Sequence, residues 1–163
     1  MQVEFFKWLL SAVLASSAAF LGAYIGLGKY KKEKVWDAKN QAYQNILNAL
    51  NEIRFWASEN LSGNVGLPVV GSKTSEELRK SYTSAKEQLE KYAYIGELVV
   101  SDDAYAVIRK VMHEISAEDF RFEDEGGDES SYQDMFIKHC EKIGKIVEEN
   151  MRQLISCARA DLK

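Results

Sequence analysis

The sequence predicts an all-α protein: a single N-terminal transmembrane helix that continues into an antiparallel cytosolic bundle of three to four helices. Residues 8–27 carry no charge, and the apolar residues beyond them recur at spacings of three and four, the period of one helix face. A strand-like run at 67–70 is short and is broken by Pro68. We expect residues 1–28 to form the transmembrane anchor and residues 29–163 to form the cytosolic bundle.

Composition narrows the class further. A chain of 163 residues suits one domain of ordinary size. An apolar content of 46% and a single proline exclude a disordered or low-complexity chain. The net charge of -4 argues against nucleic acid as a partner, because phosphate binding needs a basic surface.

The uncharged segment from Trp8 to Leu27 would rise about 30 Å as a helix, which matches the hydrocarbon thickness of a bilayer. A cleaved signal peptide is the alternative, with Ser16 and Ala18 as the small residues of a cleavage site. However, apolar sequence continues for nine residues beyond Ala18. We therefore favour an uncleaved span.

The charges that flank this segment predict its orientation. Four lysines follow the span, and lysines are retained on the cytoplasmic side, so the N-terminus is expected outside and the C-terminal region in the cytoplasm. This places the protein in the inner (plasma) membrane. These lysines can also lie against anionic lipid headgroups, although a topology signal alone is the simpler interpretation. They are Lys29, Lys31, Lys32 and Lys34.

The cysteines support the same compartment. Cys140 and Cys157 fall in one predicted helix, where 17 residues correspond to about 25 Å, whereas a disulfide needs Cα atoms within about 7 Å. Two thiols that cannot pair suit a reducing compartment.

Small residues are spaced four apart within the span. Ala18, Gly22 and Gly26 would line one ridge of the helix and let a second helix backbone approach closely. Because such spacings are common in Ala/Gly-rich spans, both packing against another span and a featureless anchor stay open.

Four helices are expected outside the span. The first continues from the membrane to about Glu59, and residues 63–71 form a loop. The second begins at a capping box formed by Thr74 and Glu77. The third begins at the cap Ser101, and the fourth begins near Ser130 or Ser131 and continues to the chain end. We expect burial of Leu89, Ile143 and Leu154, each of which lies in the middle of an apolar stripe. Aromatic residues are expected on or beside the core stripes, where they pack in the core or, alternatively, line a groove for a partner helix: Trp36, Tyr43, Trp56, Tyr82, Tyr92 and Tyr94.

Residues 118–129 hold seven acids, one arginine and two glycines, and we expect an exposed loop there. The acids lack the alternating oxygen ligands of a calcium loop, so divalent cation binding is the weaker alternative.

The sequence contains no complete zinc motif or di-iron motif. His113-Glu114 begins the zinc motif His-Glu-x-x-His, but residue 117 is alanine. The di-iron bundle pattern needs a glutamate three residues before histidine, and residues 110 and 136 are lysine and phenylalanine. We expect partly exposed histidines, no metal and no cofactor.

Nucleotide-binding loops and a nucleophile elbow are also missing from the sequence. His139 and Cys140 are adjacent, so on a helix they point about 100° apart and make a poor chelate or nucleophile–base pair. No small-molecule substrate is evident.

One resemblance adds to this interpretation. The pattern from Trp36 through Lys39 and Tyr43 to Leu50, directly after a single span, resembles short bacterial single-pass membrane-anchored helical proteins of unknown function. The ending from Ala158 to Leu162 is similar as well. The resemblance implies a membrane-anchored helical fold and carries over no functional residues.

The sequence therefore predicts a non-enzymatic membrane protein whose cytosolic bundle binds another protein or itself. Its expected partners are membrane lipid and a protein, including a second copy of this chain. A membrane-acting effector of a defence or toxin system is the alternative, and an enzyme with an unrecognised site is a third hypothesis.

Overall fold

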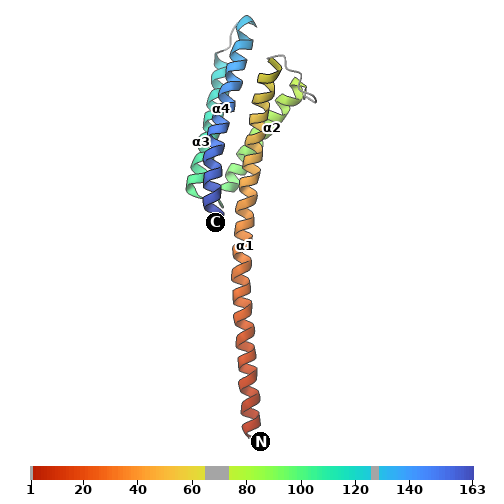
Figure 1. Ribbon diagram of the computed structural model, residues 1–163, viewed down its shortest axis with the longest axis vertical. Helices are drawn as coiled ribbons and strands as arrows, with labels where there is room; N and C mark the ends of the chain where they lie inside the picture. The colour runs from red at the N-terminus through yellow and green to blue at the C-terminus, as the bar shows by residue number, and fades with distance from the viewer. Residues whose placement is uncertain (1, 65–73, 126–128) are drawn as a thin grey trace. The chain divides into compact units, whose positions relative to one another are not determined.

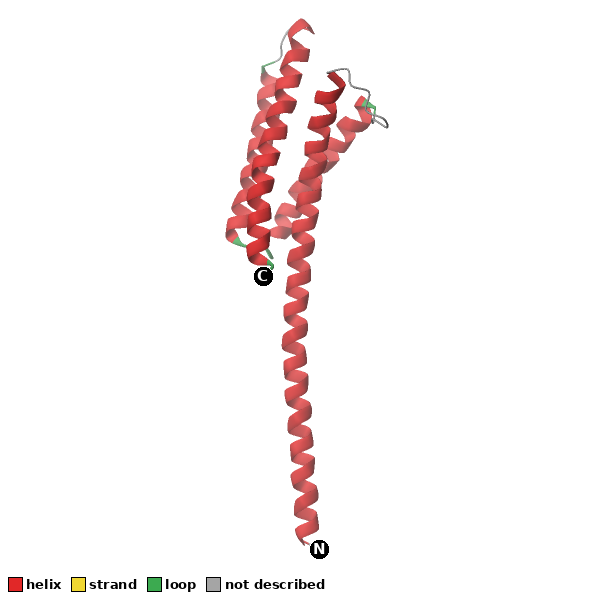
Figure 2. Cartoon of the chain, viewed as in Figure 1, coloured by secondary structure: helices red, strands yellow, loops and turns green. Residues whose placement is uncertain are grey.

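The computed structural model confirms an all-α protein: it contains four helices, and no strand occurs in residues 2–64, 74–125 and 129–163, whose backbone the structure describes (Figure 2). Side chains are described at residues 24, 26–63, 74–125 and 131–163. The expected loop at 63–71, with its strand-like run, lies largely outside the described residues.

The chain divides into two compact units, Met1–Ala38 and Lys39–Lys163. Helix α1 (Gln2–Asn64) begins in the first unit and ends in the second, five residues beyond the end expected from the sequence. The boundary predicted at residue 28 stays a prediction.

In the first unit, residues 2–38 are helical. Among the residues described there, large apolar side chains are exposed at Tyr24, Leu27, Tyr30, Val35 and Trp36. Trp36, expected beside the core, is 46% exposed. Across the part of the chain that is described, no helix has both the length and the apolar character needed to cross a membrane. Most side chains of the predicted span, residues 8–27, lie outside that part.

Helix α2 (Ser75–Gly96) begins as the sequence predicts. The Thr74 hydroxyl accepts the Glu77 amide at 3.3 Å, and a Glu77 carboxylate oxygen accepts the Thr74 amide at 2.7 Å. The capping box is therefore confirmed. It satisfies amides that have no partner inside the helix.

Helix α3 (Asp102–Asp124) is capped by Ser101, whose side chain accepts the Ala104 amide. The predicted loop at 118–129 is wrong in its first half, because residues 118–124 continue the helix. Glu118 follows Ile115 at the spacing of the buried stripe and is itself buried. Residues 126–128 lie outside the described part of the chain.

Helix α4 (Glu129–Asp161) extends almost to the chain end. Cys140 is buried and Cys157 is half-buried, and both are free, as expected for two thiols far apart on one helix. Burial raises the pKa of the Cys140 thiol to about 12, so this cysteine is an inert core residue.

The second unit is an antiparallel bundle of four helical segments: residues 39–64 of α1, then α2, α3 and α4, which run in alternating directions (Figure 1). At one end, the Tyr43 hydroxyl donates to Asp161 at 2.5 Å, and the Ser101 amide donates to the same carboxylate at 2.9 Å. At the other end, Trp56 stacks on Tyr82 with ring centroids 4.1 Å apart. Segments far apart in sequence are therefore held together at both ends.

The core confirms the predicted stripes. Leu89, Ile143 and Leu154 are 2%, 0% and 0% exposed. Tyr43, Trp56 and Tyr82 are also buried, and Tyr92 packs against the core. Tyr94 is an exception at 65% exposed, because it lies on the side of α2 away from the core.

Candidate functional site

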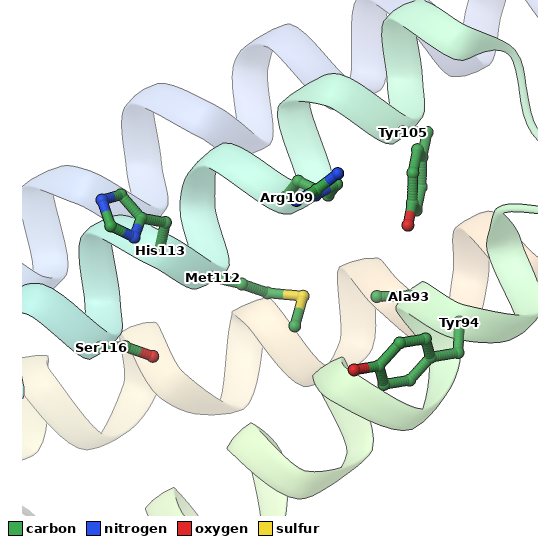
Figure 3. A pocket seen from close by; sticks show the side chains of 7 residues that line it. All are labelled: Ala93, Tyr94, Tyr105, Arg109, Met112, His113 and Ser116. Carbon is green, nitrogen blue, oxygen red and sulfur yellow. The ribbon is translucent and has the colours of Figure 1, made fainter.

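A hollow of about 500 Å³ lies between α2 and α3, within the second unit (Figure 3). Two residues of α2 line one wall, and one face of α3 supplies the other wall. The Tyr94 and Tyr105 side chains come from opposite walls, and the Met112 thioether projects toward Tyr94. The lining residues are Ala93, Tyr94, Tyr105, Arg109, Met112, His113 and Ser116.

The charge of this hollow differs from that of the chain as a whole. The protein carries a net charge of -4, yet the lining contains Arg109 and no carboxylate. Among the described residues, none forms an ion pair with Arg109 within 4 Å. Partial burial and a hydrogen bond to Glu97 raise the pKa of Tyr105, so its hydroxyl stays protonated. The hollow therefore offers one guanidinium beside apolar atoms, while the Tyr105 hydroxyl is already engaged by the Glu97 carboxylate.

Several large apolar side chains of α2, α3 and the turn between them are exposed. Tyr94 is 65% exposed and Leu98, in the turn after α2, is 85% exposed. Further along α3, Phe120 is 69% exposed. Exposed apolar side chains of this size beside a hollow, as at Tyr94, are typical of a surface that contacts another molecule.

A second polar cluster is buried where α3 meets α4. Glu118 and His139 are 8% and 3% exposed. The His139 Nε2 atom lies 3.4 Å from Asp119 Oδ1, and its Nδ1 atom lies 3.6 Å from Glu118 Oε1. The histidine ring stacks on Phe122, with centroids 4.5 Å apart, and lies edge-on to Trp56. The expectation of partly exposed histidines is therefore wrong for His139 and correct for His113, which is exposed.

Positively charged side chains pair with the carboxylates of this cluster. Arg121 donates to both oxygens of Glu118, and Lys142 lies 3.8 Å from the same group. Lys86 forms an ion pair with Asp119, which also accepts the Tyr82 hydroxyl at 2.7 Å. Cations therefore pair with both acids, and neither carboxylate is free to act on a substrate. The same contacts join α2, α3 and α4.

The protonation of this cluster follows from burial and these partners. Burial lowers the pKa of His139 and outweighs the attraction of the neighbouring carboxylates. Burial alone would raise the pKa of Glu118, but the hydrogen bonds from Arg121 and the charge of Lys142 hold it below its usual range. At neutral pH the histidine is therefore neutral and the glutamate is charged.

A third polar contact fixes the middle of α4. The buried Asn150 amide donates to Glu114 of α3 and to the Ile146 carbonyl, both at 2.8 Å. Lys110 lies 3.9 Å from the other side of Glu114. This acid is therefore engaged and does not neutralise Arg109.

The residues predicted to pack in the membrane are described only in part. The side chains of Ala18 and Gly22 lie outside the described residues, whereas a Cβ at Gly26 would meet no atom within 4 Å. The four lysines predicted to mark the membrane surface, Lys29, Lys31, Lys32 and Lys34, are all exposed. The Lys34 ammonium lies 5.6 Å from the centre of the Tyr30 ring.

No group of three His, Cys, Asp or Glu residues in the described part of the chain is placed to hold a metal ion. The idea that residues 118–129 bind a divalent cation loses its loop geometry, since residues 118–124 are helical.

Sequence reasoning missed the hollow and the buried cluster. A signal for the cluster was present, because Glu118 continues the spacing of Ile108, Val111 and Ile115 and so falls on the buried stripe. The hollow had no comparable signal, because its two walls belong to different helices.

The chain was compared with protein-family models, curated proteins and solved structures, and none of them matches it.

Proposed function

We propose that this chain is a non-enzymatic, single-pass membrane protein whose cytosolic bundle binds another protein or a second copy of itself. The observation that carries the binding part is the open hollow between α2 and α3, with its unpaired Arg109 and exposed Tyr94. The membrane part rests on the uncharged segment 8–27 and on the lysines that follow it.

The distribution of these lysines around α1 favours a spanning helix over a helix that lies on the membrane surface. With Lys29 as reference, a rotation of 100° per residue places Lys31, Lys32 and Lys34 at about 200°, 300° and 140°. A surface-bound helix would need its cations on one face, whereas a helix that crosses the headgroup layer meets lipid on every side. Tyr30 and Trp36, both exposed, are of the type enriched at that layer.

The binding part rests on the chemistry of the hollow. Tyrosine, methionine and arginine are enriched at protein interfaces, since each offers large contact area together with a polar or polarisable atom. Tyr94, Tyr105, Arg109 and Met112 provide this combination on two rigid helices. The His113 imidazole and the Ser116 hydroxyl also line the hollow. Among the described residues no hydrogen bond joins the two, so they are not arranged as a base and a nucleophile.

Reporter fusions test the membrane part. A fluorescent protein fused after Lys163 should fluoresce in bacterial cells, and alkaline phosphatase fused at the same site should be inactive, because the latter folds only outside the cytoplasm. An active phosphatase fusion would reverse the proposed orientation. Recovery of the full chain in the soluble fraction would remove the membrane anchor from the proposal.

Site-specific cross-linking tests the binding part. A photoreactive phenylalanine analogue in place of Tyr94 should form a discrete cross-linked product in membranes. The same analogue in place of Lys145, an exposed residue of α4, is the matched control. Equal or absent products from both positions would contradict a binding role for the hollow.

A further inference from the structure

One face of α3 bears a continuous stripe of side chains in which Tyr105 and Met112 are half-buried and the other four residues are exposed. Its positions follow one another at spacings of three and four, which places them on one side of the helix. The first four residues line the hollow, Phe120 is 69% exposed, and Glu123 is exposed. The stripe consists of Tyr105, Arg109, Met112, Ser116, Phe120 and Glu123.

The two halves of this stripe have opposite charge. Arg109 lies in the first half and Glu123 lies in the second half, with Asp124 next to it in the chain. The neighbouring Arg121 pairs instead with Glu118 and Glu125. Among the described residues, none forms an ion pair with Glu123 or Asp124 within 4 Å. The exposed acid and the exposed arginine are 14 residues apart, about 21 Å along one helix, so they cannot reach each other within one chain.

We infer that the partner of this face is a second copy of the chain, packed with its α3 antiparallel to the first and centred on Ser116. This inference rests on the proposed binding function and names its partner. In this register Arg109 of one copy lies opposite Glu123 of the other, and Met112 lies opposite Phe120. The contact is self-complementary, so two copies form a closed pair related by a two-fold axis.

The shapes of the side chains favour the same arrangement. Ser116 is small and exposed, so two α3 helices can approach closely where they cross. Phe120 of each copy would then enter the hollow of the other, beside the Met112 thioether and the Tyr94 ring. The hollow, at about 500 Å³, has room for one aromatic side chain. Sulfur–aromatic contact and burial of the exposed phenylalanine ring both favour this packing.

The charge pattern also opposes the parallel arrangement of the same two faces. Parallel helices would place Arg109 against Arg109 and Glu123 against Glu123, and like charges across an interface are unfavourable. A partner protein with an acidic and aromatic segment could also fit the hollow, but the present chain exposes that chemistry itself, in Phe120 and Glu123.

Disulfide cross-linking of the full-length protein in detergent tests the register. In a Cys157→Ser background, Ser116→Cys should form a covalent dimer on mild oxidation, because residue 116 meets its own copy at the two-fold axis. Ser156→Cys, an exposed position on α4, is the matched control and should remain monomeric. Equal cross-linking at both positions would overturn the proposed register.

Charge reversal tests the ion pair. Arg109→Glu and Glu123→Arg, each added separately to Ser116→Cys, should raise the concentration needed for half-maximal cross-linking by about tenfold or more, since each dimer then holds two like-charged contacts. An equimolar mixture of the two variants should recover wild-type cross-linking, because every contact in the mixed dimer is again between opposite charges. Unchanged melting of each variant would show that the bundle remains folded.

Failure to recover cross-linking in the mixture would overturn the pairing of Arg109 with Glu123. The outcome is separable from the proposed function: a Tyr94 cross-link to a different protein, with no Ser116 dimer, would leave the binding role intact and remove the second copy as partner. If neither the Tyr94 cross-link nor the Ser116 dimer forms, the binding role and the second copy as partner are both refuted.

Discussion

Replacement of Leu154 by alanine should destabilise the bundle by about 3 kcal/mol. The side chain is fully buried in α4, at 0% exposure, among residues of the common core. The change removes three carbon atoms, worth about 0.8 kcal/mol each in transfer free energy, and leaves a cavity that adds to this loss. A small domain has a total stability of about 5–15 kcal/mol, so the loss is a large fraction of it.

Urea unfolding of the full chain in detergent, followed by circular dichroism, measures this effect. With a denaturant dependence of about 2 kcal/mol per molar urea, the midpoint should fall by about 1.5 M. Leu98→Ala is the matched control, because Leu98 is 85% exposed and the same truncation should change stability by less than about 0.5 kcal/mol. Coincident unfolding curves for the two variants would refute the assignment of Leu154 to the core.

Three further changes test other parts of the bundle. Burial lowers the pKa of His139, so below about pH 6.5 the unfolded state binds more protons than the folded state, and wild-type stability should fall as the pH drops. The His139→Phe variant should lose no stability until the carboxylates begin to protonate. Urea midpoints measured across this pH range check both expectations. Gly144→Ala should raise the melting temperature by about 3–5 °C, because alanine favours a helix interior and the new Cβ would lie 3.7 Å from Ala57 Cβ, an ordinary contact. A lower melting temperature would contradict this expectation. Tyr43→Phe should cost about 1–2 kcal/mol by removing the hydrogen bond to Asp161, measured by urea unfolding against wild type, with no change if that bond is absent in solution.

The positions of the helices could be predicted because the signals for them are local. Thr74 and Ser101 cap helices through amides three residues away. Leu89, Ile143 and Leu154 lie mid-stripe, and an amphipathic helix must bury that stripe whatever it packs against. The candidate site was less accessible to this reasoning: of the residues that line the hollow, Tyr94 was expected beside the core and is exposed.

The sequence by itself determined the all-α class, the caps and the buried stripes, because each depends on neighbours within about one turn of helix. Only the tertiary structure decided that residues 118–124 are helical and that His139 is buried. The acids of this segment suggested a solvated loop, since an isolated carboxylate is costly to bury. That cost is offset by Arg121 and by Lys142 and Lys86 from other helices, and contacts between helices become visible only when the chain is folded. The hollow has the same origin, because it exists only where α2 and α3 come together.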